Sequence, residues 1–222
     1  PSMALGSIEV TPVELAYAYA TIASLGTRFE PFPLYSVTAA DGEILAERNR
    51  RRERAIDPRA AFLALHAMEG TLSRGTAKSA GELGIYFPAS GKTGTTDGNR
   101  DSWFVGFTPD VVCAVWVGYD SGADTGLTGA HGALRIWARF LRALYPQSGP
   151  VAFAPPEGVE FAEIDPESGL LATSECPQTL REAYLSGTAP TEPCPLHPAH
   201  PVADTLRKGF RSFGEYIRNL FK

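Results

Sequence analysis

The sequence PASGKTGTTDGNRDSWFVGFTPDVVCAVWVGYD, at residues 88–120, decides how the rest of this 222-residue chain is interpreted. Its second half contains two short runs rich in Val, Phe and Trp, which flank a Thr-Pro-Asp turn sequence at 108–110. Short apolar runs bounded by turn residues predict a β-hairpin. Residues 90–96 predict one more strand directly before that hairpin.

Two interpretations compete for the Gly-Lys-Thr sequence at 91–93. A phosphate-binding loop requires a glycine, four further residues and then Gly-Lys-Thr, with a helix following. Here the first glycine position is occupied by Tyr86, and the residues after Thr96 predict a turn and a strand. No helix N-terminus would therefore face a phosphate, and we reject this interpretation.

The other interpretation is the Lys-Thr-Gly element that penicillin-binding proteins and serine β-lactamases carry on a strand. The residue types suit such a site. Lys92 supplies a cation, and Thr93 and Thr95 supply hydroxyls for a substrate carboxylate. Gly94 has no side chain, so an acyl group can lie close to the strand. The core alone is weak evidence, but the strand sequence that follows it at 101–106 strengthens the match.

The chain resembles the transpeptidase domain of the bifunctional, class A penicillin-binding proteins. The resemblance covers residues 2–145 well and the tail more loosely. Besides the Lys-Thr-Gly core, it rests on four short sequences: SMALGS at 2–7, EVTP at 9–12, RGTA at 74–77 and WVGYD at 116–120. It implies an α+β fold in which helices flank an antiparallel sheet, as in serine β-lactamases.

The family's nucleophile lies in a Ser-x-x-Lys motif, and a second motif is Ser-x-Asn. No serine of this sequence has Lys three residues on or Asn two residues on. In the family both motifs lie upstream of the segment that begins here. We therefore expect a C-terminal piece of a longer protein, which supplies the Lys-Thr-Gly strand and is inactive alone. The fold is accordingly expected to lack its N-terminal part.

The resemblance also implies roles for individual residues. Lys92 and Thr95 are the expected catalytic residues, and the expected substrate-binding residues are Thr93, Gly94, Thr95 and Thr96. Lys92 would set the positive field and assist proton transfer, and the backbone N–H of Thr95 would be one oxyanion donor. Neither a cofactor nor a metal is predicted.

The implied reaction is acyl transfer. A serine attacks the penultimate D-alanine carbonyl of a peptidoglycan stem peptide, and a neighbouring amine then takes the acyl group. Stem peptides and lipid II are the expected partners, with β-lactams as covalent inhibitors and no nucleic acid. The parent would also be a glycosyltransferase, anchored by an N-terminal segment on the periplasmic side of the bacterial inner membrane.

Two alternatives stay open. A D-Ala-D-Ala carboxypeptidase or a β-lactamase-like hydrolase would use the same motifs. A non-catalytic module that binds peptidoglycan peptides would need only the strand. Upstream sequence with Ser-x-x-Lys and a glycosyltransferase domain would favour the synthase over both.

Composition excludes some classes of function. The net charge is −5, which gives no general attraction to nucleic acid. No apolar run reaches the length of a transmembrane helix, about 18 residues. The apolar content of 44% is enough for a packed core.

Three helices are predicted in the first 145 residues. Thr11, Pro12 and Glu14 form a capping-box start for one that ends at Gly26. A second begins at residues 57–58, and its expected buried residues are Phe62, Leu65, Met68 and Leu72. A third spans residues 134–144 and is expected to cover the hairpin, with Trp103 or Trp116 buried beneath it.

Three segments are predicted from the change of composition at residue 146. Residues 1–145 are the transpeptidase portion, 146–203 form a Pro-rich appendage with a short strand at 159–164, and 204–222 form a basic amphipathic helix. That helix has two equally supported roles: contact with an anionic membrane surface, or packing on its own domain.

Cys176 and Cys194 lie 18 positions apart in the appendage. For a periplasmic protein we favour a disulfide between them, worth about 2–4 kcal/mol. Zinc is the alternative, with His197 and His200 nearby, but this separation does not match the usual paired-ligand spacing.

Overall fold

The computed structural model describes residues 8–31, 33–48 and 51–199. Contacts divide the chain into two compact units, residues 1–157 and 158–222. We describe each unit by itself. The predicted helix at 204–222 lies outside the described residues.

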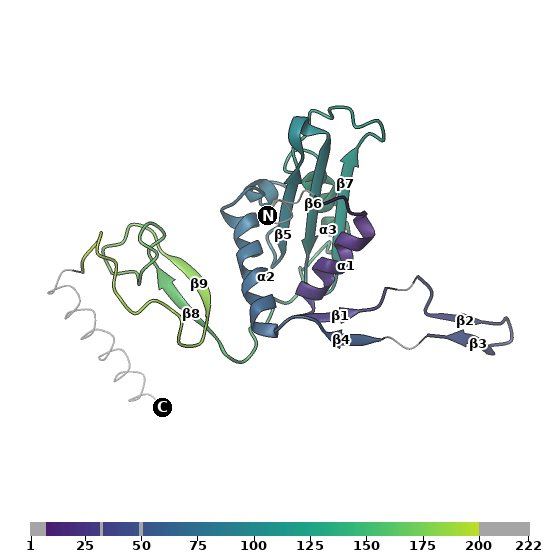
Figure 1. Cartoon of the computed structure of the whole chain (residues 1–222), viewed down its shortest axis with the longest axis horizontal. Helices are drawn as coiled ribbons and strands as arrows, with labels where there is room; N and C mark the ends of the chain where they lie inside the picture. Colours follow the sequence, from purple (N-terminus) through teal and green to yellow (C-terminus); the bar gives the residue numbers. More distant parts are fainter. Residues whose placement is uncertain (1–7, 32, 49–50, 200–222) are drawn as a thin grey trace. The chain divides into compact units, whose positions relative to one another are not determined.

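A three-stranded antiparallel sheet forms the centre of the first unit, in the order β5-β6-β7 (Figure 1). Its strands are β5 (Ser90–Thr95), β6 (Asp101–Phe107) and β7 (Val112–Gly118). The predicted strand and hairpin are confirmed, and β5 lies at an edge of this sheet. The turn between β5 and β6 contains a 3₁₀ segment, η3 (Asp97–Asn99).

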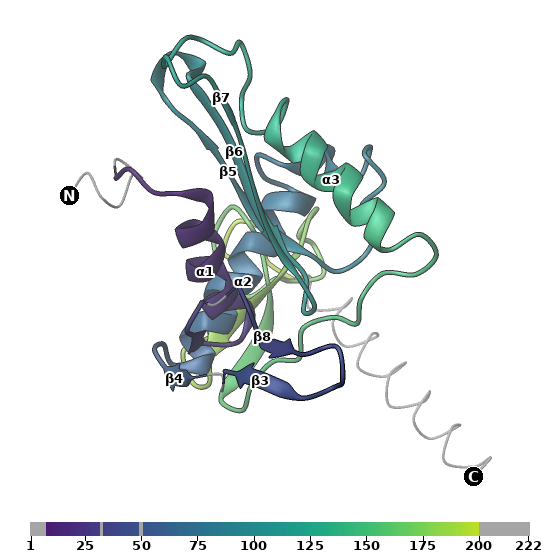
Figure 2. The same cartoon turned by 90° about the vertical axis from the view of Figure 1, so that its right-hand side faces the viewer.

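Helix α3 (Ala133–Leu144) covers one face of the sheet, and α1 and α2 lie on the other side (Figure 2). Trp137 of α3 packs against Phe104 of β6, with ring centroids 4.9 Å apart, and both side chains are fully buried. The expectation for Trp103 and Trp116 is wrong. Trp103 and Trp116 pair with each other across β6 and β7. Trp103 is the neighbour of Phe104 along β6, and successive side chains of a strand point to opposite faces, so both tryptophans face away from α3.

Helix α1 (Pro12–Ala23) begins as predicted. The Thr11 hydroxyl accepts from the Glu14 backbone N–H, and the Glu14 carboxylate accepts from the Thr11 N–H at 2.8 Å. After the helix, Gly26 has φ +83°, and a Cβ at this position would lie 2.1 Å from the Ile56 carbonyl oxygen. Only glycine fits there, because both the dihedral angle and the space exclude a side chain.

Helix α2 (Pro58–Ser73) is capped by the Asp57 carboxylate, which accepts from the Arg59 N–H at 2.8 Å. Phe62 and Leu65 are buried, as predicted, and Met68 and Leu72 are half-buried. A short 3₁₀ helix, η2 (Lys78–Ala80), follows.

Two pairs of short strands extend from the base of α1 (Figure 1). Strand β1 (Thr27–Phe29) pairs with β4 (Arg52–Arg54), and β2 (Ser36–Thr38) pairs with β3 (Ile44–Glu47). The described residues of β2 and β3 are mostly exposed, which is consistent with a surface hairpin.

The second unit is built on an antiparallel hairpin of β8 (Val159–Ile164) and β9 (Leu180–Leu185). The predicted strand at 159–164 is confirmed. The unit begins at Gly158, although the composition changes at Pro146, because the intervening segment packs on the first unit. Phe153 meets Phe107 with ring centroids 5.9 Å apart.

In the part of the chain that the structure describes, no helix has both the length and the apolar character needed to cross a membrane. The architecture is α+β, with small antiparallel sheets and three α-helices in the described residues.

Candidate functional site

The Lys-Thr-Gly sequence lies on β5, at the free edge of the three-stranded sheet. Thr93 and Thr95 pair with Phe104 and Ser102, so their side chains lie on the α3 face. Lys92 pairs with Val105 and starts from the opposite face. Lys92 and Thr95 are exposed, and Thr93 is half-buried.

The backbone of β5 offers polar groups at this edge. The Thr96 N–H donates to the Asp101 carbonyl oxygen, which makes Thr96 and Asp101 a hydrogen-bonded pair. Pairs alternate along an antiparallel ladder, so Thr95 and Thr93 direct their N–H and C=O groups away from β6. The Thr95 N–H is therefore positioned as a donor to a ligand lying along the edge.

Thr93 is joined to the turn that ends α2. Its hydroxyl oxygen lies 2.7 Å from that of Thr76, and either can be the donor. Gly75 allows this turn, because a Cβ there would lie 2.8 Å from the Thr71 Cα atom. The resemblance had singled out the sequence at 74–77, and the structure brings its threonine to the strand.

Thr95 is joined to the loop before α3. The Gly129 N–H donates to the Thr95 hydroxyl oxygen at 3.0 Å, which leaves the hydroxyl proton for a further acceptor. The loop passes very close to the strands: a Cβ on Gly129 would lie 2.5 Å from the Trp103 carbonyl oxygen and 2.7 Å from that of Gly94. Sequence reasoning missed Gly129, since one glycine in a Gly-rich loop gives no signal.

Ser102 holds the same loop from below. Its buried hydroxyl donates to the Thr128 carbonyl oxygen at 2.8 Å and accepts from the Ala133 N–H at 3.0 Å. Both the loop and the first turn of α3 are thereby fixed against β6. The sequence signal for this contact was the placement of Ser102, a polar residue, at a core position of a predicted strand. A buried hydroxyl needs a hydrogen-bond partner, so such a serine indicates a contact with another segment.

Lys92 provides the positive charge of the site. Its Nζ donates to the Thr93 carbonyl oxygen at 2.9 Å, at the edge of β5. Among the described residues, no carboxylate forms an ion pair with this ammonium group. The charge is therefore available to an anionic ligand.

Thr96 has a different environment from the other predicted residues. Its hydroxyl donates to the Asp101 carboxylate at 2.9 Å and accepts from the Asp101 N–H at 2.9 Å. Asp101 also accepts from the Trp116 indole N–H at 2.8 Å. These bonds close the turn between β5 and β6, and the substrate contact of Thr96 stays a prediction.

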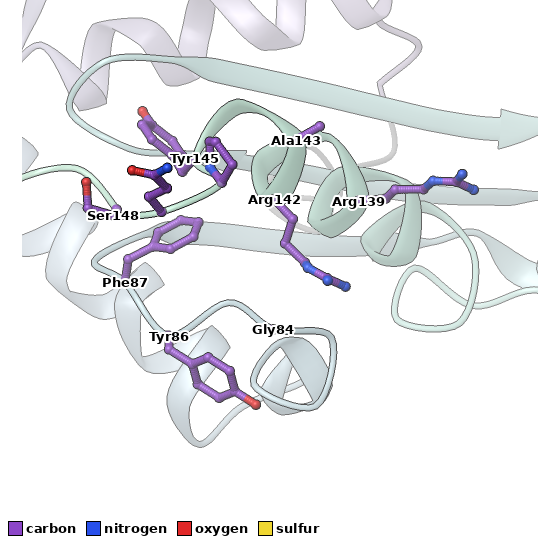
Figure 3. A pocket seen from close by; sticks show the side chains of 11 residues that line it. Gly84, Tyr86, Phe87, Arg139, Arg142, Ala143, Tyr145 and Ser148 are labelled. Carbon is purple, nitrogen blue, oxygen red and sulfur yellow. The ribbon is translucent and has the colours of Figure 1, made fainter.

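A surface hollow of about 640 Å³ lies beside α3 and the loop at 84–87 (Figure 3). Figure 3 shows that Arg139 and Arg142 reach it from α3, and that Tyr86 and Phe87 border it on the loop side. A second hollow lies between α1 and the β1–β4 pair. Residues 92–96 line neither hollow. The candidate site at these residues is therefore an open strand edge and not a pocket.

Comparisons with known proteins identify the family. Residues 2–139 match the penicillin-binding protein transpeptidase domain, and residues 155–199 match the penicillin-binding protein 1A C-terminal domain. Penicillin-binding protein 1B of Escherichia coli is 40% identical over 168 residues, which are 74% of this chain and 19% of that protein. The chain thus spans about a fifth of that relative's length.

Two solved structures share the fold. Penicillin-binding protein 1A from Haemophilus influenzae superposes with a TM-score of 0.75 at 24% identity, covering 86% of this chain and 34% of that one. Penicillin-binding protein A from Mycobacterium tuberculosis was solved as a ceftriaxone acyl-enzyme complex. It superposes with a TM-score of 0.52 at 25% identity, covering 60% of this chain and 32% of that one. The chain therefore belongs to the transpeptidase family of the class A penicillin-binding proteins.

Proposed function

We propose that this chain supplies the carboxylate-binding strand of a serine D,D-transpeptidase that cross-links peptidoglycan. The observation that carries the proposal is the edge of β5. It combines the Lys92 ammonium group, the Thr93 and Thr95 hydroxyls and an outward Thr95 N–H in a member of this family.

The substrate is a stem peptide that ends in D-Ala-D-Ala. It lies along β5, and its terminal carboxylate accepts hydrogen bonds from Thr93 and Thr95 near the charge of Lys92. Charge-assisted hydrogen bonds of this kind are shorter and stronger than neutral ones. Gly94, between the two threonines, lies on the Lys92 face of the strand, where a Cβ would lie 3.0 Å from the Trp103 Cβ atom.

The reaction begins when a serine elsewhere in the polypeptide attacks the penultimate carbonyl carbon. An ester bond forms, the peptide C–N bond breaks, and D-alanine leaves with the serine's proton. The Thr95 N–H stabilises the oxyanion, and the loss of one such donor costs about a hundred- to a thousandfold in rate. An amine of a second stem peptide then displaces the serine and takes the acyl group.

The wider setting belongs to the same proposal. The polypeptide also carries a glycosyltransferase that uses lipid II, and it works on the outer side of the bacterial inner membrane. β-Lactams acylate its serine, by analogy with the ceftriaxone acyl-enzyme complex of penicillin-binding protein A from Mycobacterium tuberculosis.

The direct test is penicillin acylation of the polypeptide that contains the serine. Lys92→Ala removes the positive charge at the strand edge, so we expect no measurable labelling by fluorescent penicillin. Arg135→Ala removes an exposed cation from α3 and is the matched control, with labelling near that of the unchanged protein. Near-normal acylation of Lys92→Ala would refute the proposal.

A second measurement uses the 222-residue chain alone. Since it has no Ser-x-x-Lys sequence, fluorescent penicillin should not label it covalently. Labelling would show that the nucleophile lies within these residues.

A further inference from the structure

Four potential metal ligands meet in the second unit: Asp165, Cys176, Cys194 and His197. One ligand atom of each lies within 4.8 Å of those of all the others. Asp165 and Cys194 are almost completely buried, with 2% exposure each. None of these groups has a role in the proposed transpeptidase site.

The turn after β8 positions Asp165. One carboxylate oxygen, Oδ1, accepts from the Glu167 N–H at 3.2 Å and the Ser168 N–H at 2.8 Å. These bonds fix the orientation of the carboxylate and leave Oδ2 directed toward the cluster, 3.3 Å from His197 Nδ1.

Backbone pairing brings the other three ligands to the same place. The Cys194 N–H donates to the Leu171 carbonyl oxygen at 2.8 Å, beside a bridge between Leu171 and Pro193. The Thr173 N–H donates to the Cys176 sulfur at 3.2 Å, and the Thr173 hydroxyl donates to the His197 carbonyl oxygen. Thr173 thus ties the turn that carries Cys176 to the segment that carries His197.

The measured separations agree with tetrahedral zinc geometry. With Zn–S near 2.3 Å and Zn–N or Zn–O near 2.05 Å, tetrahedral angles place sulfur and nitrogen about 3.5 Å apart, and nitrogen and oxygen about 3.3 Å apart. His197 Nδ1 lies 3.5 Å from Cys194 Sγ and 3.3 Å from Asp165 Oδ2. The His197 nitrogen is thus spaced for a shared ion with both the Cys194 sulfur and the Asp165 oxygen.

We propose that Asp165, Cys176, Cys194 and His197 bind one Zn²⁺ ion. Two sulfurs, one imidazole nitrogen and one carboxylate oxygen form a donor set suited to this ion. All four positions are taken by protein, so the site is structural and holds the ends of β8 and the two following loops together. A structural zinc ion contributes directly to the folding of a small unit.

A disulfide explains the same residues less well. Cys176 and Cys194 are free thiols in this structure. A disulfide would also leave the buried Asp165 carboxylate with the His197 imidazole, 3.3 Å away, as its only cationic partner in the cluster. Buried charges are normally paired or bound to a metal, because burial alone is costly. Zinc satisfies the carboxylate and both sulfurs together.

The test is the metal content of the 222-residue chain, purified with a reductant, incubated with Zn²⁺ and freed of unbound metal. We expect one zinc per chain by mass spectrometry, and tetrahedral cobalt–thiolate absorption when Co²⁺ replaces zinc. Cys194→Ser and Asp165→Asn should each weaken Zn²⁺ binding at least tenfold in a competition with a chelator. Cys113→Ser, on β7 of the first unit, is the matched control and should bind as the unchanged chain does.

If the variants misfold, the proposal can still be tested on the unchanged chain. A chelator should make Cys176 and Cys194 reactive toward a thiol reagent and lower the thermal midpoint of the second unit, and zinc should reverse both. The proposal is overturned if the reduced chain retains no zinc, or if Cys194→Ser retains as much as Cys113→Ser. It is also overturned if zinc and chelator leave thiol reactivity unchanged.

Discussion

The hydroxyl oxygens of Thr76 and Thr93 lie 2.7 Å apart, and they join the end of helix α2 to the strand that carries Lys92. Thr76 comes from the turn after α2, and Thr93 lies in the middle of β5. This hydrogen bond fixes the rotamer of a hydroxyl that we place on the substrate carboxylate. Thr76 is therefore a positioning residue, which acts through Thr93.

Thr76→Val should slow penicillin acylation of the serine-containing polypeptide by about two- to twelvefold, because one hydrogen bond contributes roughly 0.5–1.5 kcal/mol. Stopped-flow or gel-based acylation rates with fluorescent penicillin measure this change. Thr76→Ser keeps the hydroxyl and should restore the rate. Equal rates for Thr76→Val and the unchanged protein would remove Thr76 from the site.

Gly129→Ala should destabilise the first unit by about 1–3 kcal/mol, since the new Cβ would lie 2.5 Å from the Trp103 carbonyl oxygen and force the loop off the strands. Urea unfolding followed by tryptophan fluorescence measures the loss. Gly81→Ala is the control, because its nearest atoms would be 4.0 Å from the added Cβ and its dihedral angles are helical. Similar unfolding midpoints for the two variants would contradict the close approach of Gly129 to β5 and β6.

The stability of α2 should depend on pH through its cap. Hydrogen bonds from Arg59 hold the pKa of the Asp57 carboxyl well below its usual range. A carboxyl whose pKa is lowered by folding stabilises the protein above its unfolded pKa, about 3.9, and loses that contribution as pH falls through its lower folded pKa.

The comparison of Asp57→Asn with the unchanged chain isolates this effect, because asparagine is still a good N-cap. At neutral pH the unchanged chain should unfold at the higher urea concentration. The difference should shrink as pH falls below about 4. A difference that stayed constant from pH 7 to pH 2 would show that the charge of Asp57 has no part in it.

The sequence was most informative where the interacting residues are close in the chain. The Thr11–Glu14 capping box was readable because both partners lie within four residues, and it is confirmed. The hairpin of β6 and β7 was readable for the same reason: the turn sequence at 108–110 brings two apolar runs together directly. The roles assigned to Lys92 and to residues 93–96 came from a short motif and stay predictions.

Long-range contacts were not readable in the same way. Which aromatic ring lies under α3 depends on strand register, because a shift of one residue exchanges the two faces of a sheet. The sequence suggested Trp103 or Trp116, and the register instead directs Phe104 to Trp137. The hydrogen bond from the Thr96 hydroxyl to the Asp101 carboxylate likewise depends on where the turn between β5 and β6 closes, which the sequence did not show.

By itself the sequence determined the helix caps, the strands and the place of the Lys-Thr-Gly core, because each depends on periodicity or on residues a few positions apart, and the resemblance to a known family implied the α+β class. The tertiary structure decided what surrounds them. It brought Thr76 and Gly129 to β5, and it gathered Asp165, Cys176, Cys194 and His197 into one cluster. Loop paths and strand register fix such contacts, and the spacing of the residues along the chain does not encode them.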